Sequence, residues 1–372
     1  MPKIAITGSE GFIGRNLYHH LAGNNDNIIA GITIEDDETS IKNKLQGVDV
    51  VYHLAGINRP DDINEFKKGN EEFTGQLIRM LEEIGEQPRI VFSSSVQAEA
   101  ENPYGISKRN AEKILKEYAE RSSGDVIVYR LPNVFGKWSK PNYNSVVSTF
   151  CHNIARDLPI DIHDPRTIIQ LVYIDDVVIS FQRHVQEKFD AGESFRYVDI
   201  NPVFQITLQD LADMVRYFRS MRTHHTLPDF SDLLMKYLYT TYLSYLHSDD
   251  FAYTPPTKSD ERGKLTELIK SENAGQIFVS TTRPGITRGN HYHHTKVEKF
   301  CVIKGEAVIR FRHIDSEKVI SYPVTGDSIT IVDIPPGYTH NIENTGDDEL
   351  IVMFWANEKF NPDNPDTFFL EV

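Results

Sequence analysis

Three residues near the C-terminal end of the chain have types and spacing suited to binding a metal ion. His291 and His293 are one residue apart, and Glu298 follows five residues later. Side chains alternate between the two faces of a β-strand, so the two imidazoles would lie on one face. A carboxylate on a neighbouring strand would complete a ligand set for a divalent first-row metal. The alternative is that these are ordinary polar residues on a sheet.

The residues around this cluster resemble the two motifs of the cupin family. The first motif, G-x5-H-x-H-x4-E-x6-G, is matched at every fixed position from Gly285 to Gly305. The second, P-x-G-x2-H-x3-N, is matched from Pro335 to Asn344 and adds a fourth ligand. The glycine that usually opens this motif is absent. The nearest glycine, Gly326, lies three residues too far upstream, which predicts a longer hairpin before Pro335. The resemblance implies an all-β barrel with one divalent metal, which we predict to be zinc, held by His291, His293, Glu298 and His340.

A second chemical signal lies at the start of the chain. A short apolar strand, Lys3–Thr7, is followed by Gly8, Gly11 and Gly14 and then by an apolar-periodic helix. The glycines let the backbone turn tightly and approach a pyrophosphate, and the helix N-terminus offers unpaired N–H groups. This pattern predicts a dinucleotide-binding turn, although a plain strand-to-helix turn uses similar residues.

Tyr104 and Lys108 are four residues apart at the start of a predicted helix. They would share one helix face, where the ammonium group can lower the pKa of the phenol and make it a usable proton donor or acceptor. A serine at a nearby strand end can hydrogen-bond the same substrate oxygen, and Ser94 and Ser95 end such a strand. Taken alone, a Tyr-x3-Lys pair is common on amphipathic helices.

In series, these features resemble the extended, sugar-nucleotide-modifying branch of the short-chain dehydrogenase/reductase superfamily. The resemblance continues through Arg130–Gly136 and Ile169–Val177. It implies a Rossmann-type, doubly wound parallel α/β sheet. It also implies that Tyr104 is the catalytic acid, that Lys108 is its pKa partner and binds the cofactor ribose, and that Ser95 polarises the substrate. The other residues that it implies are Gly8, Gly11, Phe12, Ile13, Gly14, Arg15, Leu54 and Ala55 for the cofactor, and Ser94, Asn133 and Arg166 for the substrate.

The chain departs from this branch in two places. The segment between Ser95 and Tyr104 is short, which predicts an altered pocket roof. The second predicted strand, Ile28–Ile34, is followed by three acidic residues and lacks a single acidic residue or an arginine at its tip. The usual ribose rule therefore leaves NAD and NADP open. Arg15 could pair with a 2′-phosphate or could be a solvated helix residue.

Length, charge and cysteine content limit the class of protein. A chain of 372 residues fits two or three domains. A net charge of −15 argues against nucleic acid or anionic membrane as partners. No apolar run approaches about 18 residues, and the first strand begins at once, so we expect no membrane insertion and no signal peptide. Cys151 and Cys301 lie far apart among apolar residues, which favours a reducing, cytoplasmic compartment.

The predicted secondary structure changes from helices to alternating strands about two thirds of the way along the chain. Helices are predicted over 208–218 and 229–246, with His224 and His225 in a loop between them. A polar, proline-paired stretch over 248–263 reads as a linker, and alternating strands with Gly and Pro turns follow. We therefore predict a reductase domain over 1–247 and a barrel domain over 264–372.

A reductase-like region followed by a cupin-like region resembles the capsular polysaccharide enzymes of the CapF type, over essentially the whole chain. The resemblance implies a bifunctional enzyme of UDP-N-acetyl-L-fucosamine biosynthesis that acts on a UDP-linked 4-keto-6-deoxy-N-acetylhexosamine. The cupin region would epimerise C3, and the N-terminal domain would reduce the C4 ketone with NADPH. A homodimer is expected, because barrel edges and a tyrosine-rich helix offer surface for a partner.

Two alternatives stay open for the cupin region. It could serve ligand binding or oligomerisation without chemistry, beside a nucleotide-sugar reductase or epimerase. It could instead be a metal-dependent oxygenase, which a zinc ion would exclude. The metal itself could polarise the ketone as a Lewis acid or hold the barrel together. The base is not assigned; Lys296 and Lys299 lie near Glu298, which is assigned as a ligand.

Overall fold

The computed structural model describes residues 1–122, 124–187, 194–294, 296–335, 337–363 and 365–372. The chain divides into two compact units, which are described separately. The first unit is Met1–Val215 with Tyr237–His247, and the second is Arg216–Lys236 with Ser248–Val372. Among the described residues, no helix is both long and apolar enough to cross a membrane.

The first unit is built on a six-stranded parallel sheet with the order β2-β1-β3-β4-β5-β8. Its strands are β1 (Lys3–Thr7), β2 (Ile28–Ile32), β3 (Val50–His53), β4 (Arg89–Ser95), β5 (Val126–Leu131) and β8 (Phe195–Tyr197). The order reverses between β1 and β3, which is where ligands bind in open α/β sheets. β3 and β4 are buried along their whole length, as expected for strands covered on both faces.

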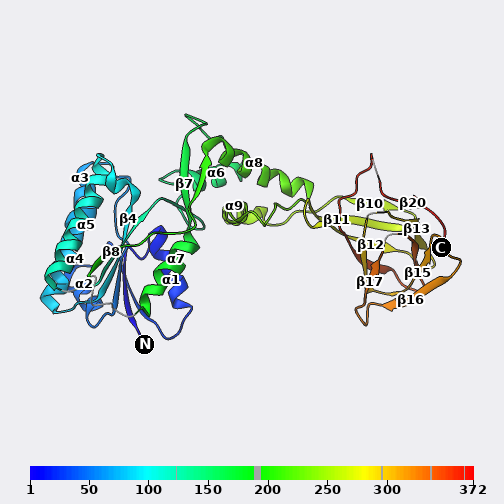
Figure 1. The fold of residues 1–372 in the computed structure, drawn as a ribbon, viewed down its shortest axis with the longest axis horizontal. Coiled ribbons are helices and arrows are strands. Elements are labelled where there is room, and N and C mark those ends of the chain that lie inside the picture. Colours follow the sequence, from blue (N-terminus) through cyan, green and yellow to red (C-terminus); the bar gives the residue numbers. More distant parts are fainter. Residues whose placement is uncertain (123, 188–193, 295, 336, 364) are drawn as a thin grey trace. The chain divides into compact units, whose positions relative to one another are not determined.

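Helices cover both faces of this sheet (Figure 1). On one side lie α1 (Phe12–Ala22) and α7 (Ile174–Gln182), and on the other α2 (Glu38–Leu45), α4 (Phe73–Ile84) and α5 (Pro103–Ser122). Shorter elements are α3 (Asn64–Phe66), the π-helix η1 (Lys67–Glu72) and the 3₁₀ turns η2 (Val96–Glu99) and η3 (Arg183–Val185). Leu77, Leu81 and Leu115 are fully buried between α4, α5 and the sheet. The predicted doubly wound fold is confirmed.

A small three-stranded sheet completes the first unit, with the order β6-β7-β9. Its strands are β6 (Asn133–Phe135), β7 (Ile168–Tyr173) and β9 (Phe204–Thr207), and the helices of this region are α6 (Val146–Ile154), α8 (Leu208–His224) and α9 (Leu233–Leu243). α8 runs six residues beyond its predicted end, so His224 is helical rather than in a loop. His225 follows with a φ of 55°. α9 is shorter than predicted at both ends.

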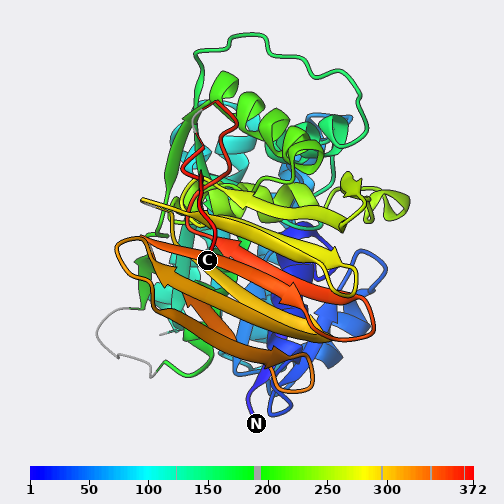
Figure 2. The ribbon, with the colours of Figure 1, turned by 90° about the vertical axis from the view of Figure 1, so that its right-hand side faces the viewer.

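Besides the end of α8 from Arg216 and the start of α9, the second unit contains two antiparallel sheets, as the predicted all-β barrel requires (Figure 2). One has the order β10-β11-β12-β19-β14-β17 and the other β16-β15-β18-β13-β20. The first sheet contains β10 (Thr257–Asp260), β11 (Gly263–Ser271), β12 (Gly275–Thr282), β14 (Glu298–Lys304), β17 (Ile331–Ile334) and β19 (Leu350–Ala356). The second contains β13 (Thr287–Tyr292), β15 (Glu306–His313), β16 (Val319–Thr325), β18 (Tyr338–Asn344) and β20 (Phe368–Phe369).

Apolar side chains from both sheets form the core of this unit. Val302, Ile309, Ile342 and Val352 are all 3% exposed or less and belong to one cluster. The stretch predicted as a linker contains the 3₁₀ turn η4 (Ser248–Asp250) and then β10, which pairs with β11. The polar composition that suggested a linker is explained by the exposure of every β10 residue at the sheet edge.

Candidate active site and metal centre

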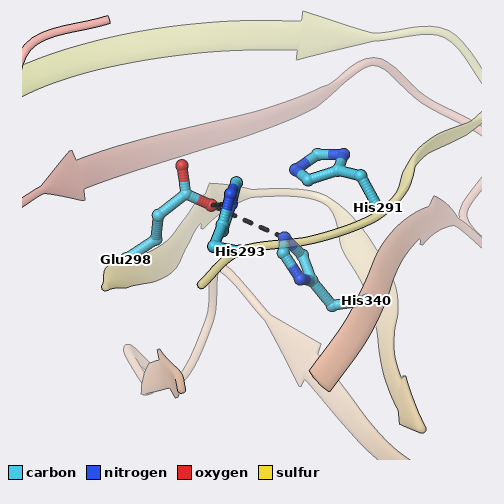
Figure 3. Close-up of side chains that lie close together, drawn as sticks. All are labelled: His291, His293, Glu298 and His340. Carbon is cyan, nitrogen blue, oxygen red and sulfur yellow. Dashed lines mark ion pairs between the residues drawn. The ribbon is translucent and has the colours of Figure 1, made fainter. Parts of the chain in front are cut away.

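Four side chains converge inside the second unit, as Figure 3 shows. One ligand atom from each of His291, His293, Glu298 and His340 lies within 4.8 Å of the others. Glu298 Oε2 is 3.4 Å from Nε2 of His293 and 3.5 Å from Nε2 of His340. His293, Glu298 and His340 are buried, and His291 is half-buried. The structure thus brings together all four residues that the cupin motifs predict as metal ligands.

Strand pairing explains how His291 and His340, 49 positions apart in the sequence, meet. β13 pairs with β18, and His291 lies opposite His340 in that register. A β-bulge between Gly289 and His291, with Asn290 at a φ of 59°, precedes the first ligand. Such bulges re-aim side chains next to functional sites. Glu298 comes from the first residue of β14 in the facing sheet.

The hydrogen bonds of the two buried histidines leave one nitrogen on each for a metal. Nδ1 of His293 contacts the Asp366 carbonyl, and Nδ1 of His340 lies 3.2 Å from the Tyr338 carbonyl. In the described part of the chain, both Nε2 atoms are buried and make no hydrogen bond. A carbonyl on one imidazole nitrogen fixes the tautomer that presents the other nitrogen to a metal. The donor set therefore fits a divalent cation.

Electrostatics also favour the protonation states that a metal needs. Burial, with the neighbouring His340 and His293, lowers the pKa of His291 to about 4. Burial raises the pKa of Glu298, but the close imidazoles of His293 and His340 outweigh it and hold that pKa well below its usual value. A neutral imidazole and an ionised carboxylate are the forms that coordinate metals.

The glycine turn after β1 is as tight as a dinucleotide site requires. Gly8 has a φ of 67°, and a side chain there would place Cβ 2.8 Å from the Ala55 backbone. A Cβ at Gly14 would lie 2.1 Å from the Gly8 carbonyl oxygen. The Thr7 hydroxyl accepts hydrogen bonds from the amides of Leu54 and Ala55, each at 3.1 Å. The ends of β1 and β3 are thereby joined at the reversal of strand order.

A cleft of about 700 Å³ opens beside this turn. The residues that line it come from the Gly8 turn, the segments after β2 and β3, and the helices α2, α3, η1 and α4. Its lining includes Gly8 and Ala55 from the predicted cofactor residues. Arg15 instead places its guanidinium 4.7 Å from the Trp138 ring. Phe12 and Ile13 begin α1, directly after the turn.

The predicted catalytic residues meet at the end of β4 and the start of α5. The Ser95 hydroxyl lies close enough to the Tyr104 phenol to lower the pKa of that phenol, and the Lys108 ammonium donates to the Ser93 carbonyl at 2.8 Å. A Cβ at Gly56, which lines the cleft, would lie 3.3 Å from Lys108 Nζ. Lys108 is therefore adjacent to the dinucleotide cleft.

Burial dominates the electrostatics of this group. It raises the pKa of the Tyr104 phenol, and the neighbouring Ser95 hydroxyl offsets only part of that rise. The effect of Lys108 on the phenol stays a prediction. Burial also lowers the pKa of Lys108 itself to about 8, against the opposing charge of Glu112. Desolvation dominates because Lys108 is buried and Tyr104 is half-buried.

Sequence reasoning missed Glu112, one helical turn beyond Lys108. This buried carboxylate contacts the Ser94 hydroxyl, and it accepts hydrogen bonds from Arg130 at 2.7 and 3.0 Å and from the Tyr197 hydroxyl at 3.0 Å. The Ser94 hydroxyl is thus engaged away from the phenol, so Ser95 is the stronger of the two serine candidates. The spacing of Tyr104, Lys108 and Glu112 along one helix face was the available signal.

Asn70 was also missed, because an isolated asparagine on a helix carries no signal in the sequence. It lies in the π-helix η1, donates to the Ser107 hydroxyl at 2.9 Å and exchanges two hydrogen bonds with the Ile57 backbone. π-helical turns often occur at functional sites. A Cβ at Gly56 would lie 2.9 Å from its side-chain oxygen. Asn70 therefore braces the wall of the cleft beside Lys108.

The remaining substrate candidates lie at the small sheet. Asn133 begins β6 and donates to the Gln170 carbonyl at 3.0 Å. Arg166 precedes β7, and its side chain is 93% exposed, 3.7 Å from Asp164. Their contact with a substrate stays a prediction.

The N-terminal and C-terminal parts of the chain each match the model of a known protein family. Residues 4–200 match the model of the NAD dependent epimerase/dehydratase family, and residues 258–368 match that of a polysaccharide biosynthesis C-terminal domain. The chain is 44% identical over 370 residues to a UDP-2-acetamido-2,6-beta-L-arabino-hexul-4-ose reductase of Pseudomonas aeruginosa, covering 100% of this chain and 99% of the relative. It also resembles the crystal structure of the capsular polysaccharide assembling protein CapF of Staphylococcus aureus, with 44% identity, a TM-score of 0.91 and coverage of 99% and 100%.

Proposed function

The chain belongs to the NAD-dependent epimerase/dehydratase family, and from this premise we propose that it is a bifunctional nucleotide-sugar enzyme of capsular polysaccharide biosynthesis. Its N-terminal region reduces the C4 ketone of a UDP-linked 4-keto-6-deoxy-N-acetylhexosamine with NADPH. Its C-terminal barrel epimerises C3 of the same sugar. The observation that carries the proposal is full-length similarity to a hexulose reductase in a chain that joins Ser95, Tyr104 and Lys108 beside a dinucleotide cleft.

The reductase residues have distinct roles in this proposal. Bound NADPH supplies the hydride for C4. The Ser95 hydroxyl and the Tyr104 phenol hold the ketone oxygen between them, and Tyr104 gives its proton to that oxygen as negative charge develops. Lys108 binds the cofactor ribose and, as a cation, favours loss of the phenolic proton. The turn from Gly8 to Gly14 receives the pyrophosphate at the N-terminus of α1.

The barrel chemistry precedes reduction, because it needs the ketone. The C4 carbonyl acidifies the C3 proton, a base removes it to give an enolate, and reprotonation from the other face inverts C3. His291, His293, Glu298 and His340 would hold a divalent metal, preferably zinc, which supplies either Lewis acidity at the ketone or structural support. Reduction then removes the ketone and makes the inversion permanent.

A deuterium-exchange experiment with two variants tests whether the two reactions are separate. Tyr104→Phe should abolish NADPH oxidation, leave cofactor affinity nearly unchanged, and still exchange the C3 hydrogen of the keto sugar in deuterated water. His293→Ala should lose the exchange yet keep hydride transfer, giving a product of the other C3 configuration. Mass spectrometry measures deuterium at C3, and NMR assigns the product.

The same experiment decides between this proposal and a barrel without chemistry. Absence of exchange in Tyr104→Phe protein would show that the barrel takes no part in epimerisation. Reduction activity above a few per cent of wild type in that variant would overturn the assignment of Tyr104. A lowered melting transition in His293→Ala protein would identify the metal as structural, a role that the burial of three of its four ligands would suit.

A further inference from the structure

An acidic side chain just beyond β2 lines the dinucleotide cleft, but its carboxylate is already engaged within the protein. Asp36 accepts hydrogen bonds from the Thr33 amide at 2.8 Å, the Ser40 hydroxyl at 2.6 Å and the Lys44 ammonium at 2.5 Å. The Lys44 ammonium also donates to the Gly31 carbonyl at 2.9 Å. The Asp36 side chain is only 11% exposed. Both members of the ion pair are therefore held in place.

These contacts change what the carboxylate can do for a cofactor. In dinucleotide-binding folds, a free carboxylate beyond the second strand accepts hydrogen bonds from the ribose 2′-hydroxyl of NAD, and its charge disfavours the 2′-phosphate of NADP. The hydrogen bond from Lys44 is the largest cause that holds the pKa of Asp36 far below its usual value, so the group stays ionised but paired. Its oxygen atoms already accept hydrogen bonds from within the protein, and its charge is already paired with that of Lys44.

We propose that Lys44 sets the cofactor preference of this chain by masking Asp36, so that the cleft accepts a ribose 2′-phosphate and favours NADPH over NADH. Lys44 is then a specificity-determining residue that acts through Asp36. The inference deepens the proposed function, because it takes from it the use of a nicotinamide cofactor in this cleft. It does not depend on the identity of the sugar or on the barrel.

The other charges of the cleft agree with this reading. Glu38 and Glu83 also line the cleft, and Lys42 pairs with each of them at 2.6 Å. Two lysines of α2 thus neutralise part of the charge of three of the four carboxylates that line the cleft, in a chain of net charge −15. The fourth is Glu65, and Lys68 also lines the cleft. Within the described residues, Arg79 lines the same cleft without an ion pair. A doubly negative phosphate therefore meets far less repulsion than the acidic composition suggests.

A double-mutant cycle on cofactor binding tests the proposal without any sugar substrate. Isothermal titration measures the affinity of the full-length protein for NADPH and for NADH in wild type, Lys44→Met, Asp36→Asn and the double variant. Wild type should bind NADPH more tightly. Lys44→Met should lower the ratio of NADPH to NADH affinity by about tenfold or more, since it exposes a carboxylate. The double variant should return to within about threefold of Asp36→Asn, because no carboxylate remains to be masked.

The possible outcomes distinguish the masking role of Lys44 from the proposed function and from direct binding of the phosphate by Lys44. An unchanged ratio in Lys44→Met overturns the masking role alone and leaves the proposed function intact. Equal loss of NADPH affinity in Lys44→Met and in the double variant would mean that Lys44 binds the phosphate directly, which also overturns masking. A wild type that prefers NADH overturns both this inference and the NADPH assignment. Lys44→Arg, which keeps the charge, should retain the preference, and Lys113→Met on the exposed side of α5 is the matched lysine control.

Discussion

At the scale of single residues, burial rather than pairing decides the chemistry of the proposed reductase site. Tyr104 and Lys108 lie on one helix face as their spacing predicts, yet desolvation raises the pKa of the phenol and lowers that of the ammonium. Glu112, which is itself neutralised by Arg130, is the charge that opposes the effect on Lys108. The group of interacting charges therefore extends one helical turn beyond the Tyr-x3-Lys motif.

The pH dependence of cofactor use follows from this arrangement. Burial lowers the pKa of Lys108 to about 8, so kcat/KM for NADPH should fall as pH rises through that value and the ammonium proposed to bind the ribose loses its proton. Glu112→Gln removes a charge that raises this pKa, so the descending limb should move to lower pH. Glu99→Gln, which removes the exposed carboxylate on Arg130, is the control. If the descending limb of kcat/KM lay at the same pH in wild type and in Glu112→Gln protein, Glu112 would not raise the pKa of Lys108.

At the scale of elements, two local devices position the two sites. The glycine turn brings α1 against the end of β1 with no room for a side chain at Gly14. In the second unit, the segment after β19 contacts the metal-ligand loop through Asp366, whose carboxylate accepts the amides of His294 at 2.9 Å and Lys296 at 2.8 Å. Its carbonyl contacts His293. Each device ties a functional loop to regular structure.

Gly14→Ala should destabilise the protein and abolish cofactor binding. The added Cβ would lie 2.1 Å from a backbone oxygen, so the turn must open, at a cost of at least about 1–3 kcal/mol in the free energy of unfolding. Gly75→Ala is the matched control, because its Cβ would meet only the Arg79 side chain at 3.9 Å within α4. That change should instead stabilise by roughly 0.5–1 kcal/mol. Denaturant unfolding and NADPH titration measure both, and normal binding by Gly14→Ala protein would refute the tight-turn argument.

Asp366→Ala should weaken metal binding without touching a ligand. Losing the two amide contacts frees the loop that carries His293, and supports of this kind are typically worth about 10–100-fold in metal affinity. Competition with a chromogenic zinc chelator measures the change. Asp363→Ala, on the same segment and exposed, should bind the metal as wild type does. Equal affinity in all three proteins would show that this segment does not support the site.

At the scale of the whole molecule, each function is proposed for one of the two compact units. One outer face of the second unit carries exposed apolar side chains on neighbouring strands, with Ile303 at 44%, Ile331 at 64% and Met353 at 40% exposure. Apolar faces of this kind commonly mark a protein interface. This observation gives the predicted homodimer a candidate surface.

Light scattering at micromolar concentration should therefore give a mass near twice the 42.6 kDa of one chain. Ile331→Lys places a charge on the apolar face and should shift the mass towards one chain. Val319→Lys, at an exposed apolar position of the other sheet, is the control. A wild-type mass near that of one chain would refute the dimer. A dimer that survives Ile331→Lys would place the interface elsewhere.

The sequence by itself determined what depends on local spacing. The period of a strand and the rise of a helix are constant, so His291 with His293, and Tyr104 with Lys108, could be placed on common faces from their numbers alone. The glycine pattern likewise predicted a turn whose tightness the structure bears out at Gly14. The doubly wound sheet was implied by the resemblance to the short-chain dehydrogenase/reductase superfamily. The all-β barrel was predicted from the cupin motifs and from the alternating strands with glycine and proline turns.

Only the tertiary structure decided how distant residues act on one another. The bond of Asp36 with Lys44, the burial that shifts the pKa of Tyr104 and the support of His293 by Asp366 arise from contacts that no local period encodes. The end of α8 and the edge strand β10 were also misjudged, because helix ends and edge strands are decided by packing partners. Spacing specifies which side chains share a face, whereas desolvation and pairing depend on which elements fold over that face.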